Sequence, residues 1–89
     1  MMTRQVVVSN ALGMHARAAA RFVHLATSFQ ARVTVNRDGR SVDGKSILGL
    51  LLLAARCQSV VTITAEGPDE EAAAEALVRL VETGFGEAP

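Results

Sequence analysis

The 89-residue sequence is poor in the residues that mark several classes of protein: it has one cysteine, no tryptophan, no tyrosine and three phenylalanines. Because Cys57 has no partner within the chain, no internal disulfide can form, and we expect a reducing, cytoplasmic location. The shortage of aromatic side chains leaves little surface for stacking nucleic-acid bases, so we expect no nucleic-acid partner. The longest apolar run, residues 47–55, is interrupted by Gly49 and is much shorter than the roughly 18 residues of a membrane span. We therefore expect no membrane insertion, and the first residues also lack the pattern of a secretory signal.

The charges balance overall but are unevenly distributed. Lysine and arginine total 9, aspartate and glutamate total 9, and the formal net charge is zero. Residues 1–57 hold eight basic and two acidic side chains, whereas residues 58–89 hold one basic and seven acidic ones. The basic part can steer an acidic partner or an anionic substrate, although a solvated surface with segregated charges explains the same counts. The length and the 49% hydrophobic content predict one globular domain over residues 1–89.

The hydrophobic periodicity predicts an α/β domain with the order β-α-β-β-α-β-α. Apolar residues spaced by three and four predict helices that start at Ala16, at Ile47 (ending near Arg56) and at Asp69 (ending at Gly84). Short β-branched or alternating runs predict strands over residues 4–9, 32–37, 40–42 and 60–65. Such an order favours a two-layer, open-faced β-sandwich, in which a four-stranded, mainly antiparallel sheet carries three helices on one face.

His15 and Arg17 are the first candidates for chemistry. His15 lies where a turn leads into a helix, and the first N–H groups of a helix attract anions. Arg17 adds a permanently charged donor, while an imidazole is a nucleophile near neutral pH. Together they can hold a phosphate or carry one covalently, although an exposed histidine that caps a helix explains the same pattern. His24, nine residues further along, is too distant to share a metal with His15, so we expect no metal site and no cofactor.

Residues 39–46 match the G-x-x-x-x-G-K-[ST] pattern of phosphate-binding loops. The context argues against a nucleotide site here. Asp38 and Gly39 form a hairpin signal, so the residues between the two glycines are expected to be a returning strand. In addition, 89 residues cannot supply the large parallel sheet of nucleotide hydrolases.

The second predicted helix is apolar all round, yet a two-layer domain can bury only one of its faces. We expect an inward face of Leu50, Leu53, Ala54 and Cys57, with Cys57 as a small core residue. The outward face would then consist of Ile47, Leu48 and Leu51. Such an exposed patch is typical of a surface that binds another protein, but a neighbouring copy or helix could also cover it.

Three sequence blocks resemble the histidine-containing phosphocarrier (HPr) family of the bacterial phosphotransferase system. They are residues 10–17 (NALGMHAR), 44–50 (GKSILGL) and 66–70 (EGPDE), and residues 85–87 (FGE) resemble the family's C-terminal tail. The resemblance extends over almost the whole chain with the same spacing between blocks. It implies a sheet order of 1-4-2-3 and a carrier that turns over no substrate of its own.

The resemblance also implies the partners and the site. His15 would accept a phosphoryl group from enzyme I on Nδ1 and pass it to a downstream acceptor domain of the enzyme II A type, with Arg17 stabilising the phosphate. Ser46 matches a serine that a dedicated kinase phosphorylates in some members, and it is equally explained as a helix N-cap. The partner-docking residues would be Arg21, His24, Ile47, Leu48 and Leu51, on a monomer. The alternative is a regulatory interaction module controlled by phosphorylation at Ser46.

The sequence departs from the family pattern at two places. Ala18 stands where members of the sugar-transport branch usually have proline. Alanine at this position is similar to members of the nitrogen branch, so the branch to which the chain belongs stays open. The loop after the second helix, Arg56-Cys57-Gln58-Ser59, lacks the glycine common in the family. This second departure bears on the shape of that turn and not on phosphorylation.

Overall fold

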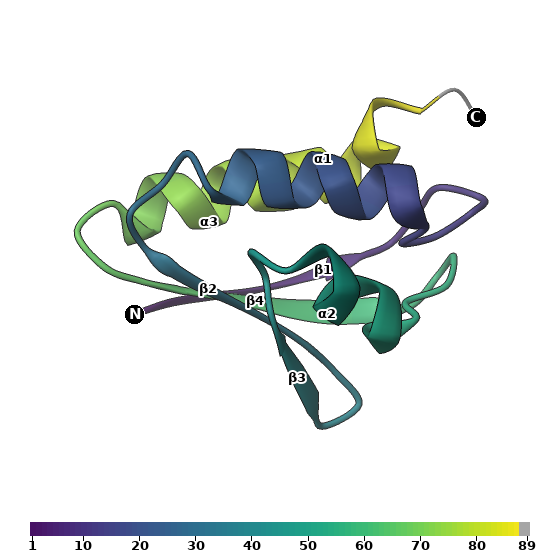
Figure 1. Cartoon of the computed structure of the whole chain (residues 1–89), viewed down its shortest axis with the longest axis horizontal. Helices are drawn as coiled ribbons and strands as arrows, with labels where there is room; N and C mark the ends of the chain where they lie inside the picture. The colour runs from purple at the N-terminus through teal and green to yellow at the C-terminus, as the bar shows by residue number, and fades with distance from the viewer. Residues whose placement is uncertain (88–89) are drawn as a thin grey trace.

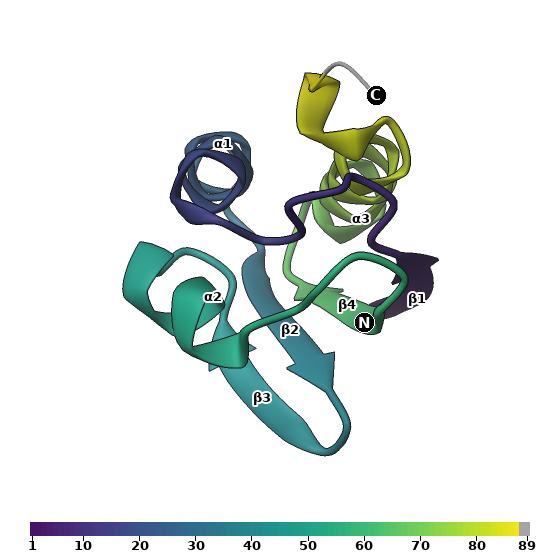
Figure 2. The same ribbon diagram turned by 90° about the vertical axis from the view of Figure 1, so that its right-hand side faces the viewer.

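The computed structural model describes residues 1–87 and shows a four-stranded sheet with three helices (Figures 1 and 2). All strand pairs are antiparallel, and the order across the sheet is β1-β4-β2-β3. Both the two-layer fold and the sheet order are therefore as expected. The elements are β1 (Met2–Val7), α1 (Ala16–Ala26), β2 (Arg32–Arg37), β3 (Arg40–Asp43), α2 (Ile47–Leu53), β4 (Val60–Glu66), α3 (Glu70–Glu82) and the short 3-10 helix η1 (Gly84–Gly86).

The core lies between the sheet and the helices. Along β4, Val61, Ile63 and Ala65 are fully buried while the intervening residues are partly exposed, because successive side chains of a strand point to opposite faces. Phe22 of α1 and Leu77 of α3 pack into the same layer and are also fully buried. Within residues 1–87, no helix is long and apolar enough to cross a membrane.

Helix α2 is shorter than the sequence predicts: it ends at Leu53 and not near Arg56. Ala54 adopts a left-handed conformation with φ of 55°, and this conformation ends the helix. Two arginines from the β2–β3 hairpin donate to carbonyls at this end, Arg37 to Ala54 O at 3.3 Å and Arg40 to Leu52 O at 3.5 Å. They supply partners for carbonyls that a helix end leaves free.

The early end of α2 makes part of its predicted inward face wrong. Leu50 and Leu53 are fully buried as expected, but Ala54 is exposed and Cys57 is half-buried, so Cys57 is not a core residue. Once the helix stops, the helical spacing no longer determines which side chain points inward. Ala55 takes the buried position instead, at 3% exposure.

The turn between α2 and β4 forms without the family's glycine. Gln58 adopts the left-handed conformation there, with φ of 73°. Its N–H donates to Val8 O at 2.6 Å, and the N–H of Val8 donates to Ser59 O at 2.8 Å, which joins the turn to the end of β1. These backbone bonds offset the strain that a side chain meets in this conformation.

Asp69, which precedes α3, attaches that helix to the loop after α1. Its carboxylate accepts the N–H groups of Gln30 and Ala31, both at 2.8 Å. The bond from Gln30 is the main reason why the pKa of Asp69 lies below its ordinary value. Helices α1 and α3 are thus joined at one end.

Candidate functional site

His15 is the N-cap of α1, as its position in the sequence suggested. Its backbone is extended, and its Nδ1 accepts the N–H of Arg17 at 3.2 Å. The side chain is 26% exposed, so part of the ring is open to solvent. The first turn of α1 holds no acidic side chain that could occupy the positive end of the helix. An anion can therefore approach both Nδ1 and the free N–H groups of this turn.

The turn before His15 sets its position. Gly13 has φ of 66°, and a Cβ at this residue would lie 2.6 Å from Ala55 O, so this backbone conformation and close approach need glycine. Next to it, the N–H of Met14 donates to the same Ala55 O at 2.8 Å. Asn10 closes the turn, because its Nδ2 donates to Gly13 O at 2.8 Å. The start of α1 is thereby held against the end of α2.

Glu87, just beyond η1, forms the other side of the site. Its Oε2 lies 2.5 Å from Nε2 of His15, and its Oε1 accepts Nδ2 of Asn10 at 2.8 Å. The pKa of Glu87 lies below its ordinary value, chiefly because of the bond from Asn10 and then because of His15, against the opposing effect of burial. The group that faces His15 at neutral pH is therefore a carboxylate.

Arg17 and Arg21 lie beside a shallow hollow of about 380 Å³ at this end of α1. Glu87 also lines the hollow, together with Gly86 and the exposed turn residues. Arg21 donates through Nη1 to Phe85 O, which attaches η1 to α1. Arg17 is exposed and lies two residues from the imidazole, where its guanidinium can reach an anion bound at the helix end.

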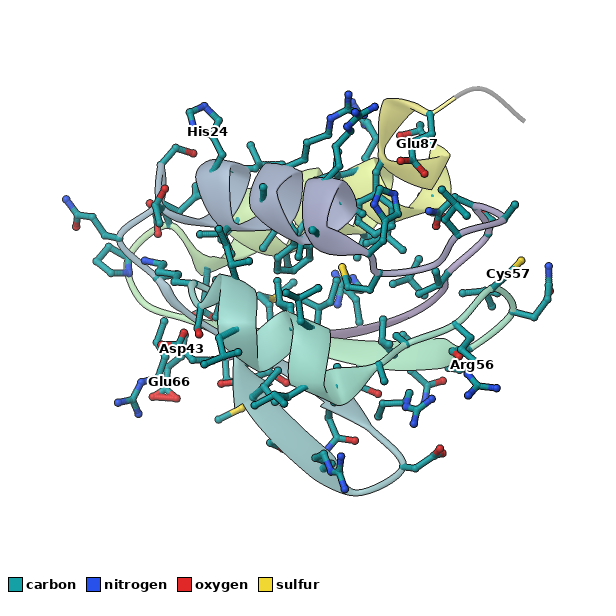
Figure 3. The ribbon with its side chains drawn as sticks, turned by 45° about the vertical axis from the view of Figure 1, so that its right-hand side comes forward. His24, Asp43, Arg56, Cys57, Glu66 and Glu87 are labelled. Carbon is teal, nitrogen blue, oxygen red and sulfur yellow. The ribbon has the colours of Figure 1, made fainter. Side chains whose placement is uncertain are left out.

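His24 is not part of this site. It lies in the last turn of α1 and is exposed, at the opposite end of the helix from Glu87 (Figure 3). Nine residues of helix separate it from His15 by about 13 Å along the axis. Residues 1–87 contain no group of three or more His, Cys, Asp or Glu side chains that could hold a metal ion.

Ser46 and the outward face of α2 form a separate region. Ser46 is the N-cap of α2, and its Oγ accepts the N–H of Gly49 at 3.0 Å. Apolar side chains on the helix remain exposed, and we call them the α2 patch: Ile47 (43%), Leu48 (66%), Leu51 (37%) and Leu52 (62%). The structure confirms that the three predicted members point outward and adds Leu52.

A family model described as "PTS HPr component phosphorylation site" matches residues 2–83. The chain belongs to this family. It is 46% identical over 87 residues to the phosphocarrier protein HPr of Cupriavidus necator, with 98% of each chain covered. It is 39% identical over 85 residues to the phosphocarrier protein NPr of Shewanella violacea, covering 96% of this chain and 93% of the relative.

A solved structure shows the same fold. The crystal structure of HPr-C-His from Thermoanaerobacter tengcongensis superposes with a TM-score of 0.96 at 42% identity and covers both chains completely. The function expected from the sequence, a phosphocarrier of the phosphotransferase system, is therefore confirmed. The comparisons do not favour the regulatory alternative over it.

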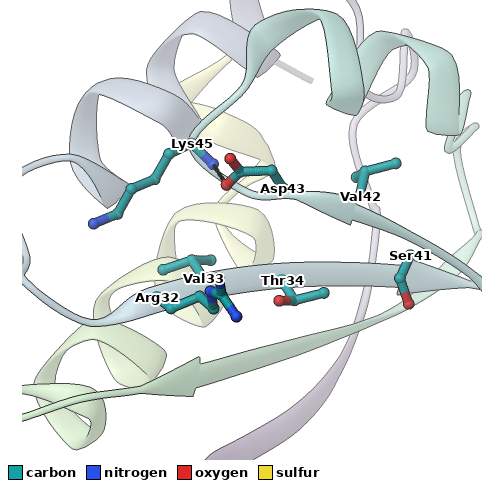
Figure 4. A pocket seen from close by; sticks show the side chains of 7 residues that line it. All are labelled: Arg32, Val33, Thr34, Ser41, Val42, Asp43 and Lys45. Atoms are coloured by element: carbon teal, nitrogen blue, oxygen red, sulfur yellow. Dashed lines mark hydrogen bonds between the residues drawn. The ribbon is translucent and has the colours of Figure 1, made fainter.

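The phosphate-loop pattern of residues 39–46 does not form a cradle in this HPr-family fold. Ser41, Val42 and Asp43 are paired residues of β3, as Figure 4 shows at the hollow beside this strand. The side chain of Lys45 donates to Phe29 O at 2.8 Å. The nucleotide interpretation is thus rejected, in agreement with the expectation from the hairpin signal.

Sequence reasoning did not assign a role to Glu87 or Asn10. Asn10 begins the block of residues 10–17 that resembles the family but has no role of its own there, and Glu87 lies 72 residues from His15 along the chain. Their contacts depend on η1 returning to the start of α1, which no local pattern encodes. The resemblance of residues 85–87 to the family's tail was the one signal that pointed to Glu87.

Proposed function

We propose that His15 is the residue that carries the phosphoryl group, with Nδ1 as the atom that bonds to phosphorus. The observation that carries this assignment is the direction of Nδ1, which accepts the N–H of Arg17 in the first turn of α1. A phosphoryl group on that nitrogen would have its oxygens next to those donors and to Arg17. These are the groups that stabilise phosphate at a helix end.

We propose phosphorylated enzyme I as the donor and a domain of the enzyme II A type as the acceptor. In transfer, the Nδ1 lone pair attacks the phosphorus of the donor and the donor's bond to phosphorus breaks. The reverse event on the acceptor returns the carrier to its free state. A carrier that serves two partners needs an accessible nucleophile, and the 26% exposure of His15 beside a shallow hollow meets this need.

The α2 patch is the proposed docking surface for both partners, and Arg21 and His24 are the proposed contact residues on α1. An apolar centre with charged groups around it is a common arrangement in transient protein interfaces. The basic N-terminal part of the sequence suits partners with acidic surfaces. We propose that this relay operates in the cytoplasm, in agreement with the single unpaired cysteine.

Ser46 is proposed as a regulatory site for a serine kinase. A phosphate there would lie at the N-terminus of α2, next to Ile47 and Leu48 of the patch. It would favour the helix through its dipole and would repel an acidic partner from the docking surface.

The test is phosphorylation by purified enzyme I and phosphoenolpyruvate, followed by intact mass. Wild type should gain one acid-labile phosphoryl group, His15→Ala should gain none, and His24→Ala should still gain one at the end point, because it keeps the proposed acceptor. His24→Ala is a matched control because it removes the second histidine of the chain on the same helix. Phosphorylation of His15→Ala at the wild-type rate would refute the assignment, and no adduct on wild type, with a functional enzyme I control, would favour the regulatory alternative.

A further inference from the structure

We propose that Glu87 is a positioning residue: it keeps the proton of His15 on Nε2, so that the lone pair of Nδ1 is available at the start of α1. This proposal rests on the proposed role of His15 as the phosphoryl acceptor. It concerns a different atom, because Glu87 contacts the side of the ring that does not bond to phosphorus.

Hydrogen bonds determine the orientation of Glu87. Nδ2 of Asn10 donates one hydrogen to Gly13 O and the other to Oε1 of Glu87, both at 2.8 Å. Asn10 is 8% exposed, and its Oδ1 is buried without a hydrogen-bond partner. If the amide were flipped, Oδ1 would face Gly13 O and Oε1 of Glu87, which are both acceptors. The amide is therefore held with its NH2 group toward Glu87. The other carboxylate oxygen is then left for Nε2 of His15.

The tail that carries Glu87 is itself anchored. Phe85 is 1% exposed, and its carbonyl accepts Nη1 of Arg21. Gly84, which begins η1, is buried as well, and its Cβ would lie 3.5 Å from Cβ of Asn10. The position of the carboxylate thus depends on packed residues and not on a chance surface contact.

The hydrogen bonds at the two ring nitrogens of His15 favour one tautomer. A carboxylate accepts hydrogen bonds and cannot donate one, so Nε2 must carry the proton when it contacts Glu87. At Nδ1 the N–H of Arg17 is the donor, which requires the lone pair on this nitrogen. In transfer, however, the N–H groups of the first turn are needed by the phosphoryl oxygens. Glu87 then remains as the partner that keeps the proton on Nε2.

The same contact offsets the charge that transfer creates. When Nδ1 forms its bond to phosphorus and the donor's bond to phosphorus breaks, the electron pair of the broken bond returns to the donor. The proton on Nε2 stays in place, so the ring becomes positively charged. The carboxylate of Glu87 lies next to that charge without having to move.

Replacing Glu87 by glutamine gives a specific test of this mechanism. The side-chain oxygen of glutamine would be taken by Nδ2 of Asn10, which leaves its NH2 group facing Nε2 of His15. That arrangement favours the tautomer with the proton on Nδ1, where no lone pair is available for attack. Glu87→Ala merely removes the contact. We therefore expect Glu87→Gln to be the slower carrier, although glutamine resembles glutamate in shape.

The experiment combines nitrogen NMR of His15 in the unphosphorylated protein with single-turnover phosphorylation by enzyme I. In wild type the neutral ring should have its proton on Nε2, and Glu87→Gln should move the population toward Nδ1. The rate should fall roughly tenfold in Glu87→Ala, by analogy with the lower end of the effect of removing the carboxylate partner of a metal-bound histidine, and further in Glu87→Gln. Glu82→Gln, which removes an exposed carboxylate from the end of α3, should change neither measurement.

The proposal and the function on which it rests fail in different ways. An unchanged tautomer in Glu87→Gln, or a Glu87→Gln rate equal to that of wild type, overturns the role of Glu87 while His15 still takes the phosphoryl group. A Glu87→Ala variant slower than Glu87→Gln also overturns it, because it indicates that Glu87 only supports the tail. Absence of phosphate on His15 in wild type overturns the proposed function itself.

Discussion

Alanine substitutions at Gly13 and Gly39 distinguish two destabilising effects: backbone strain, which both variants have, and a steric clash near His15, which only Gly13→Ala has. Both have positive φ, 66° and 83° respectively. A Cβ at Gly39 would have no atom within 4 Å, whereas a Cβ at Gly13 would lie 2.6 Å from Ala55 O and 2.9 Å from Cα of Arg56. Gly39→Ala therefore tests the conformation alone, and Gly13→Ala adds a clash with backbone that has no rotamer to change.

The expected losses follow from this difference. An alanine in the left-handed conformation costs about 1–2 kcal/mol, part of which is offset because alanine restricts the unfolded chain. For Gly39→Ala we expect the free energy of unfolding to fall by about 1 kcal/mol, or roughly 4–8 °C in Tm for a domain of this size. A clash in a well-packed region adds about 1–3 kcal/mol, so Gly13→Ala should lose about 2–4 kcal/mol in all.

The clash should also affect function. Relief of the overlap at Gly13 requires the carbonyl of Ala55 to move, and this carbonyl holds the N–H of Met14, the residue before His15. Gly13→Ala should therefore slow phosphorylation at temperatures where it is folded, and Gly39→Ala should not. Urea unfolding followed by far-UV circular dichroism is the suitable stability assay, since the chain has no tryptophan or tyrosine. Equal losses in the two variants would refute the steric argument, as would a normal phosphorylation rate in Gly13→Ala.

Three further perturbations test other parts of the structure. Ser46→Ala should lose about 1 kcal/mol of stability because the N–H of Gly49 loses its cap. Ser46→Asp should keep the stability but slow transfer from enzyme I. Equal unfolding midpoints for wild type and Ser46→Ala would contradict the capping role. Gln58→Gly should raise stability by a few tenths to about 1 kcal/mol, measured by urea unfolding, because glycine meets no steric cost at φ of 73°. Asp69→Asn should be less stable than wild type at neutral pH. Since the pKa of Asp69 is lowered on folding, its contribution is present above the ordinary value of 3.8 and is lost as the pH falls below that value toward the folded pKa. The two stability curves should converge in this acid range, and a constant gap down to the lowest pH would refute the role of Asp69.

Most of the fold could be predicted because its elements have local signals. Ser46 is a helix N-cap that can be recognised from the residues after it, and the alternation around Val61 and Ile63 identifies a strand with one buried face. The end of α2 could not be predicted in this way. The stop lies at Ala54, a residue with high helix propensity, and it is stabilised by arginines from the β2–β3 hairpin. A tertiary contact overrides the local preference there, and the error about Cys57 follows directly from it.

The candidate site also has one part that local sequence predicts and one part that depends on tertiary contacts. His15 and Arg17 are neighbours in one helical turn, so helix geometry alone places both beside the same free N–H groups. This half of the site, which we propose binds the phosphoryl group, can be predicted from the sequence. The half that contacts Nε2 of His15 is assembled by Asn10 and Glu87, from opposite ends of the chain, once η1 packs against α1. The binding of an anion therefore needs one helix end, whereas control over which nitrogen carries the proton needs the completed fold. Glu87→Ala should therefore keep affinity for phosphate and weaken the preference for Nδ1 as the nucleophile.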